Sequence, residues 1–404
     1  MFDKFPVEKT KLRLEHLFSL LPIFWLFTGH LWLKDSSKTL VAITVLFLLT
    51  SIFFCSLKNI RNNLKSRKFL WIIFGIAAYG LISKEIHGYS NKEIRVLLSV
   101  AIYFSVVSDR FIKFMLEKIH WLLFLCSVTT LCYSVYQTYF LEVDRGLWPL
   151  NPIPLTTVSA GAAVCALAYL LKTKLTTEKI VLSATFLLSL SAILVSETRG
   201  SLLALLSGSI LIILMHLKEQ KIRFKTILSA IIVVFSVGFI LKDSILSRYY
   251  LTMEEIKNIS DGNLDTSIGF RFQLWESALH TPISLLGLGD KHIDFREALY
   301  NENIISQSAV YWDHYHNQFI SSLYIHGIIG LIGLISMLIT PILLLRNNNK
   351  EALFSLILVY FIASITDIPF NQSISLGFYL VMVLFMLASN SKEFETKLGR
   401  QYDE

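Results

Sequence analysis

The chain has 404 residues, of which 54% are hydrophobic and only 17% are charged, whereas soluble domains carry about a quarter charged residues. This composition excludes an ordinary soluble globular protein, because the charges fall in short clusters between apolar runs of about 15–25 residues, the length that spans a bilayer. The net charge of +7 does not require nucleic acid as a partner, since membrane proteins accumulate Lys and Arg on their cytoplasmic loops.

In chain order, the apolar runs predict an all-α polytopic membrane protein with about 12 transmembrane helices. The runs are 15–33, 39–57, 69–83, 96–108, 119–141, 155–171, 180–196, 201–217, 226–241, 318–345, 352–366 and 372–389. The run 318–345 is longer than one crossing, so we expect one helix that tilts or extends beyond the membrane. Three parts result: 1–241 with membrane helices 1–9, the loop 242–317 with amphipathic helices, and 318–404 with helices 10–12 and a cytoplasmic tail.

The distribution of Lys and Arg predicts the orientation of these helices. Alternate segments, starting with the N-terminus, hold 24 of these residues, whereas the short loops on the opposite side hold 7. Because cytoplasmic loops carry the excess of basic residues, both termini are expected in the cytoplasm and the large loop 242–317 outside it. The four cysteines lie inside apolar runs and offer neither a disulfide framework nor a zinc spacing.

The large loop ends in a polar, histidine-rich stretch, residues 312–319, directly before an apolar run. His314 and His316 would share a face of an extended chain, which allows three interpretations: a metal site, interfacial histidines, or a catalytic base. The sequence specifies no third ligand, and a stable metal site needs three or four. Histidine titrates near neutrality and can accept a proton from a hydroxyl group, so we favour a base and expect no metal.

Three arginines are predicted at the same outer surface. Arg199 lies in a short turn between two apolar runs, where it can pair with Glu197, contact a lipid headgroup or bind an anion; Gly200 beside it would allow a ligand close approach. Arg271 and Trp275 lie in the segment 267–279, which predicts an amphipathic helix at the interface. Arg271 can also be a solvated residue.

Arg248 follows the ninth run beside two tyrosines, where it can equally anchor the chain at the interface. Together these arginines favour a ligand that carries phosphate, because the guanidinium fork binds phosphate oxygens with two hydrogen bonds. A lipid diphosphate-linked sugar would place its pyrophosphate at this depth. Its pyrophosphate is already a good leaving group, so the site needs charge stabilisation and a base for the attacking hydroxyl.

At these residues the sequence resembles the O-antigen ligase family, within the superfamily of O-antigen ligases, O-antigen polymerases and bacterial O-oligosaccharyltransferases. The elements that match are Thr198-Arg199-Gly200, Gly269-x-Arg271 with Trp275, and His314-x-His316-Asn317 followed by Gly327, Gly330 and Gly333. The helix layout and the position of the large loop match as well. The sequence departs from many relatives at His326, where an acidic or small residue often precedes the glycine-rich helix.

The resemblance implies a GT-C-like fold in the bacterial inner membrane, with the large loop in the periplasm. It also implies transfer of a glycan from undecaprenyl pyrophosphate-linked O-antigen to lipid A–core, with inversion and with neither ATP, cofactor nor metal. Carried over by position, His316 is the general base, and Arg199 and Arg271 bind the pyrophosphate, with Arg248 as a further candidate. The supporting residues are His314, Asn317, Asp367 and Trp275.

Other functions remain open on the sequence alone. An O-antigen polymerase uses the same donor and another acceptor, although the His-x-His-Asn element favours the ligase. A protein O-oligosaccharyltransferase usually carries additional C-terminal helices or domains. An anion transporter or channel is disfavoured because the apolar runs hold almost no ionisable residues. The surrounding membrane lipids are expected partners in every case.

Overall fold

The computed structural model describes residues 4–53, 55–87, 91–219, 239, 242–345 and 349–388, and within these ranges it contains helices and no strand. The expected all-α class is therefore confirmed. The helices of the first half are α1 (Lys4–Phe27), α2 (Ser36–Ser51), α3 (Leu57–Ser66), α4 (Phe69–His87), α5 (Asn91–Val106), α6 (Asp109–Glu117), α7 (Ile119–Val135), α8 (Pro152–Lys172), α9 (Thr176–Val195) and α10 (Arg199–Glu219).

The second half contains helices of both the bundle and the large loop. They are α12 (Lys242–Ser260), α13 (Ser267–Leu279), α14 (His292–Asn301), α15 (Gln307–Val310), α16 (Gln318–Tyr324), α17 (Gly327–Leu344), α18 (Lys350–Thr366) and α19 (Ser373–Ala388). Short helical turns connect several of them: η1 (Gly29–Leu31), η2 (Tyr136–Phe140), η3 (Arg145–Leu147), η4 (Gly289–Lys291) and η5 (Pro369–Asn371).

The core of the bundle lies around α8 and α19, whose side chains are buried along almost their whole length. Helix α8 packs against α7, α9, α10, α18 and α19. Its sequence is rich in Ala, Ser and Thr, and such small residues allow neighbouring helices to approach closely. Helix α10 begins at the candidate site residue Arg199, and helix α18 ends just before Asp367. Both helices thereby lie side by side against the central helix α8.

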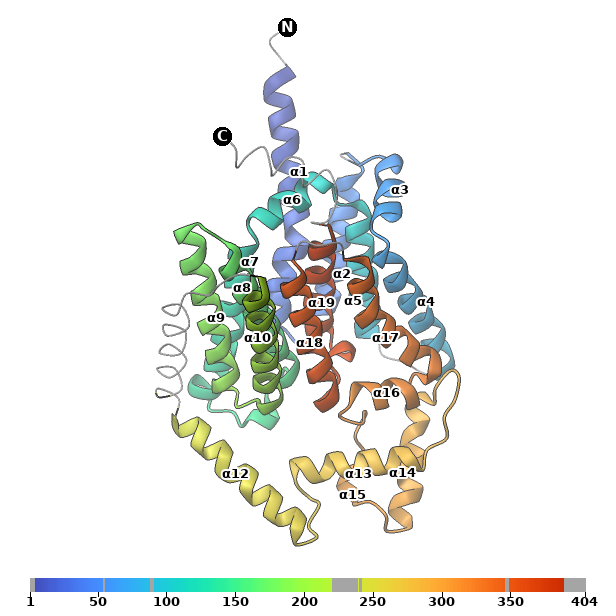
Figure 1. The fold of residues 1–404 in the computed structure, drawn as a ribbon. Coiled ribbons are helices and arrows are strands. Elements are labelled where there is room, and N and C mark those ends of the chain that lie inside the picture. Colours follow the sequence, from blue (N-terminus) through green and yellow to red (C-terminus); the bar gives the residue numbers. More distant parts are fainter. Residues whose placement is uncertain are drawn as a thin grey trace.

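The basic segments 58–68 and 110–118 and the large loop 242–317 lie at opposite ends of the bundle, as expected from the distribution of Lys and Arg (Figure 1). The amphipathic helices α3 and α6 lie at one end, close to the start of α1, and helices α12 to α15 of the large loop lie at the other. The predicted helix 267–279 is confirmed as α13, which begins after Thr266, whose hydroxyl accepts a hydrogen bond from the Gly269 backbone N–H. The side of the membrane that each end faces stays a prediction.

Among the described residues, six helices are long and apolar enough to cross a membrane. They are Phe69–His87, Ile119–Phe140, Pro152–Lys172, Thr176–Val195, Arg199–Leu217 and Gly327–Leu344. Helices α2 and α19 are apolar but shorter. The predicted ninth run, 226–241, and the C-terminal tail from residue 389 lie outside the described residues, so the total of twelve spans stays a prediction.

The expectation of one continuous helix over 318–345 is wrong. The chain breaks after Tyr324 and resumes as α17 at Gly327, whose φ of 72° lies in the left-handed region that favours glycine. A segment of the large loop 242–317 fills the break: the backbone N–H groups of Leu288 and Ile328 donate to Tyr324 O and Ser284 O, at 2.9 and 3.1 Å. The break thus joins α16, which follows the histidine stretch, to the large loop.

Replacement of Gly327 by Ala is expected to destabilise the protein. The added Cβ would lie 2.3 Å from Gly287 N, and the positive φ alone costs about 1–3 kcal/mol for a residue other than glycine. Thermal unfolding in detergent should show a clearly lower midpoint for Gly327→Ala. Gly75→Ala is the matched control, because its Cβ would meet nothing within 4 Å. Equal midpoints for the two variants would contradict this account of the break.

Candidate active site

The histidine stretch is held by the residue between its two histidines. Tyr315 is fully buried against the loop helices, where the Arg296 guanidinium lies 4.4 Å from its ring centroid and His292 packs beside it. The indole N–H of Trp275 on α13 donates to Tyr315 O at 3.0 Å. The predicted supporting residue Trp275 therefore fixes the backbone of this stretch. Arg296, which the sequence analysis did not single out, supports it from α14.

His316 has a strained backbone and a carboxylate beside its ring. Its φ is 47°, in the left-handed region, and such strain in a residue other than glycine concentrates at functional sites. Its Nδ1 lies 3.5 Å from Oδ1 of Asp367, and the two side chains are 13% and 2% exposed. This is longer than a normal hydrogen bond, as is often found for catalytic pairs without substrate. Asp367 is thus placed to orient the imidazole.

Asp367 follows the last turn of α18 and is buried. Burial alone would raise the pKa of its carboxyl group, but the interactions with His316 and His314 outweigh burial and lower that pKa. The group therefore stays ionised at neutral pH. An ionised carboxylate on Nδ1 favours the tautomer that keeps the proton there, which leaves Nε2 of His316 free to accept one.

His314 has a different environment from His316. Its Nδ1 accepts a hydrogen bond from the His316 backbone N–H at 3.0 Å, so this nitrogen carries no proton. Burial, and then the neighbouring His316, lower the pKa of His314 to about 4. A neutral imidazole whose Nδ1 is already engaged holds the loop in shape. The geometry therefore favours His316 over His314 as the base, as did the resemblance to the O-antigen ligase family.

Asn317 and Gln318 attach the histidine stretch to the end of α18. The Asn317 side-chain oxygen accepts from the backbone N–H groups of Phe319 and Ile320, and its amide donates to Ile365 O at 3.2 Å. Gln318 accepts from Phe370 N at 2.9 Å. These contacts place the predicted supporting residue Asn317 at the junction of the two segments that carry His316 and Asp367.

A buried network continues from Gln318 to the break before α17. The Gln318 amide donates to Asn371 Oδ1 at 2.5 Å, and the Asn371 amide lies 2.9 Å from Nε2 of His326. Burial, and then the nearby His292 and His87, lower the pKa of His326 to about 3, so its neutral Nε2 can accept this bond. The departure from relatives noted at His326 is therefore accommodated by a specific hydrogen bond.

Arg199 is the first residue of α10, and its side chain pairs with an acid from the large loop 242–317. Its Nη2 donates to Oε1 of Glu255 on α12 at 2.8 Å, whereas the sequence offered Glu197 as one of three alternatives for its partner. A Cβ on Gly200 would lie 2.8 Å from Oγ1 of Thr366. Glycine at this position thus allows the start of α10 to lie against the end of α18, next to Asp367.

Arg271, on α13, completes the cluster. Burial lowers the pKa of its guanidinium, the carboxylates of Asp367 and Glu255 oppose this shift, and the charge of Arg199 adds to it. All three charges are therefore close enough to act on Arg271. The structure brings together Arg199, Arg271, His316 and Asp367, which were predicted from distant parts of the sequence. Arg248 lies in α12, and its side chain lies outside the described part.

The same cluster contains a possible set of metal ligands. One ligand atom each from His314, His316 and Asp367 lie within 4.8 Å of one another. Asp367 thus supplies the third ligand that the sequence analysis did not find. Absence of a metal stays a prediction.

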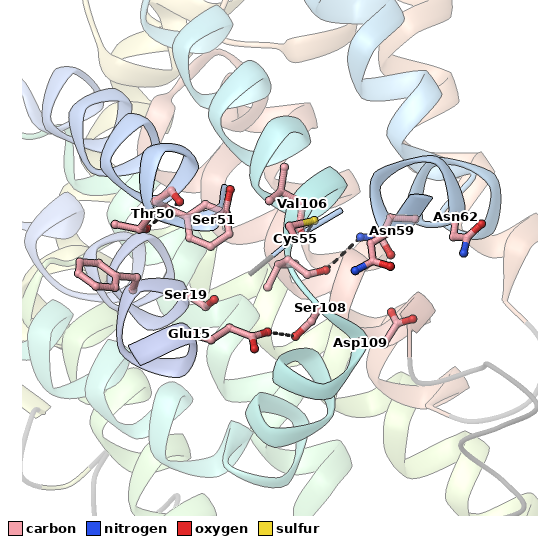
Figure 2. A pocket seen from close by; sticks show the side chains of 14 residues that line it. Glu15, Ser19, Thr50, Ser51, Cys55, Asn59, Asn62, Val106, Ser108 and Asp109 are labelled. Atoms are coloured by element: carbon pink, nitrogen blue, oxygen red, sulfur yellow. Dashed lines mark hydrogen bonds between the residues drawn. The ribbon is translucent and has the colours of Figure 1, made fainter. Parts of the chain in front are cut away.

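A separate cavity of about 230 Å³ lies at the opposite end of the bundle (Figure 2). Its lining comes from α1, α2, α3 and the start of α6 and includes Glu15, Cys55 and Asp109. Glu15 accepts a hydrogen bond from the Ser108 hydroxyl at 2.6 Å. The lining contains neither histidine nor arginine, so this cavity does not share the chemistry of the arginine–histidine cluster.

Comparison with known proteins supports the family that the motifs indicated. Residues 184–335 match a family model described as O-antigen ligase. The match runs from the second part of α9 to the first part of α17, and this range includes Arg199, Arg271 and His316. An uncharacterized protein from Haemophilus influenzae is 28% identical over 152 residues, which cover 35% of this chain and 38% of that protein. The alignment thus spans well under half of the relative.

The pKa of His326 predicts a loss of stability in acid. Because its folded-state pKa of about 3 is below the unfolded value near 6.5, its contribution is complete above pH 6.5 and declines as the pH falls toward 3. Between pH 7 and 5 this amounts to about 2 kcal/mol. His326→Gln retains an acceptor but does not titrate, so its unfolding temperature in detergent should fall less than that of the wild type between these pH values.

The exposed His280 provides the control for this measurement. His280→Gln should reproduce the wild-type dependence on pH, since the ring is not buried. A His326→Gln protein that loses as much stability as the wild type between pH 7 and 5 would show that His326 does not carry this dependence.

Proposed function

We propose that the protein transfers a glycan from undecaprenyl pyrophosphate to a hydroxyl group of lipid A–core, because residues 184–335 match a family model described as O-antigen ligase. The reaction takes place at the periplasmic face of the bacterial inner membrane, with both termini in the cytoplasm. The observation that carries this proposal is the clustering of two arginines with a His–Asp pair at the end of the bundle covered by the large loop.

The two arginines are suited to the pyrophosphate of the donor. Arg199 is 37% exposed and lies at the N-terminus of α10, where unpaired backbone N–H groups and the helix dipole add positive potential. Arg271 approaches from α13, so the two cations come from different helices. Bidentate hydrogen bonds from both would neutralise the charge that develops on the leaving pyrophosphate. Arg248 on α12 remains a candidate for the same role.

His316 and Asp367 supply the base. The acceptor hydroxyl oxygen attacks the anomeric carbon, its proton passes to Nε2 of His316, and the bond from that carbon to the pyrophosphate oxygen breaks. The electron pair leaves with the pyrophosphate, and attack from the opposite face inverts the anomeric centre. The ionised Asp367 stabilises the imidazolium through Nδ1. The reaction needs no second carboxylic acid, because pyrophosphate departs without protonation, and no cofactor is involved.

The lipid parts of both substrates would lie in the surrounding membrane. Several helices of the bundle carry exposed apolar side chains, including Leu203 and Leu214 on α10 and Leu343 on α17. Contact of these side chains with membrane lipids removes them from water. A prenyl chain beside the bundle would hold the diphosphate at the depth of Arg199, so that binding supplies the position of the reacting atoms. A GT-C-like arrangement of the helices is part of the proposal.

The lipopolysaccharide of cells that depend on variants of this protein tests the proposal. His316→Ala should lower transfer by about 10²–10⁴-fold, which gives rough lipopolysaccharide on a gel while lipid-linked polymer accumulates. Arg199→Lys should also impair transfer, because lysine lacks the planar fork. His280→Ala, at an exposed histidine of the same loop, is the control and should retain long chains.

The form of the product distinguishes the alternatives. Long chains on lipid A–core in His316→Ala cells would show that His316 is not the base. Attachment of single repeats alone would identify a polymerase, and transfer of the glycan to protein would identify an oligosaccharyltransferase. Wild-type transfer by Arg199→Lys would remove the argument from bidentate binding.

A further inference from the structure

The cation proposed to bind the donor is already paired with an anion of the same chain. Arg199 Nη2 lies 2.8 Å from Glu255 Oε1, and the side chains are 37% and 16% exposed. Glu255 lies on α12, 56 residues after Arg199. The ion pair therefore joins the start of a bundle helix to the outer loop, and it occupies the guanidinium that a diphosphate would need.

The carboxylate of Glu255 acts on both arginines. Besides its ion pair with Arg199, it is one of the two negative charges that oppose the lowered pKa of Arg271. Among the described residues, Oε2 of Glu255 and Nε of Arg271 are buried without a hydrogen-bond partner. Arg271 therefore retains an unused hydrogen-bond donor, which is costly in a purely structural contact and is available to an anion that enters the site.

The neighbouring Glu254 differs from Glu255, which is the acid that pairs with Arg199. Glu254 precedes it on the same helix and is exposed, so α12 does not need a second acid at this point for solubility. The Arg199–Glu255 ion pair is partly buried, and the cost of removing its charges from water offsets much of their attraction. Its contribution to the fold alone is therefore a weak reason for a carboxylate beside two arginines.

We propose that Glu255 is an internal competitor of the donor, which holds Arg199 in the substrate-free protein and is displaced by the pyrophosphate group. This inference rests on the proposed function, since it takes Arg199 and Arg271 as the pyrophosphate ligands. It adds a residue that determines which anions enter the site. Glu255 and a bound pyrophosphate repel each other, so both cannot occupy Arg199 at once.

Because Glu255 competes for Arg199, an anion binds there only if its interactions with the arginines outweigh this ion pair. A pyrophosphate diester carries more than one negative charge and can contact both arginines, so its interactions replace the lost ion pair. A membrane phospholipid offers one phosphate group, which is less able to displace the carboxylate. Weakly binding anions therefore leave Arg199 paired with Glu255, and the arginines stay available to the diphosphate-linked donor although phosphate headgroups surround the protein.

Binding of inorganic pyrophosphate to the purified full-length protein tests the inference without relying on activity. Calorimetry at fixed low salt should show that Glu255→Gln binds pyrophosphate about two- to fivefold more tightly than the wild type, the size expected for loss of one partly exposed ion pair. Glu254→Gln should bind like the wild type. Inorganic phosphate should bind measurably to Glu255→Gln and much more weakly to the wild type.

The direction of the change separates a competitor from a structural contact. Unchanged or weaker pyrophosphate binding by Glu255→Gln would overturn the inference, because a residue that merely docks α12 cannot inhibit binding. Glu255→Asp gives a second test with the charge retained: its carboxylate is one methylene shorter, so it should tighten binding by a smaller factor. Binding by Glu255→Asp that is no tighter than that of the wild type would contradict the inference as well.

Arg199→Ala distinguishes failure of this inference from failure of the proposed function. Loss of pyrophosphate binding in Arg199→Ala without a gain in Glu255→Gln would reject the internal competitor and leave the assignment of the arginines intact. Wild-type affinity in Arg199→Ala would reject that assignment itself.

Discussion

The attachment of the histidine stretch to the end of α18 is the contact on which the site depends. Asn317 caps α16 with its oxygen and donates from its nitrogen to Ile365 O, while Gln318 bonds to both Phe370 and Asn371. Both side-chain amides thus join the histidine stretch to the segment around the end of α18, which is distant in sequence. Because an unsatisfied buried polar group costs about 1–3 kcal/mol, these bonds fix the register in which His316 faces Asp367.

The charges of the site are balanced in the absence of substrate. Arg199 and Arg271 are opposed by Glu255 and Asp367, and His314 is held neutral by burial and by His316. A donor that brings further negative charge must change this balance, either by displacing Glu255 or by leaving an arginine partly unpaired. The charges proposed to bind the donor and those that keep Asp367 ionised therefore belong to one network rather than to two separate sites.

The candidate site residues could be picked out from the sequence, because their types and positions relative to the apolar runs are informative, while their chemical roles stay predictions. An arginine in a short turn between two apolar runs and histidines before an apolar run have few structural explanations. Helix α13 could be predicted from the spacing of its apolar residues. The break before α17 could not, since apolar residues continue on both sides of it and the backbone that fills it comes from residues 284–288.

The partners of these residues were harder to predict. Glu255 lies in a charged helix in which an exposed glutamate precedes it, so nothing local distinguishes the two. Gln318, Asn371 and Arg296 are polar residues whose role appears only when tertiary contacts bring α14, α16 and η5 together. Asp367 was assigned a supporting role by its position in the sequence alone, and only the structure shows that it lies 3.5 Å from His316.

The central claim is that His316 is a base oriented by an ionised Asp367, and that these groups do not serve as metal ligands. The most direct test is the initial rate of glycan transfer by purified wild-type and Asp367→Asn protein, each with excess chelator and with added Zn²⁺. The account predicts a wild-type rate unaffected by chelator and a rate lowered by about 10²-fold or more in Asp367→Asn under both conditions. Loss of wild-type activity in chelator with recovery on adding Zn²⁺, or full activity of Asp367→Asn, would contradict it.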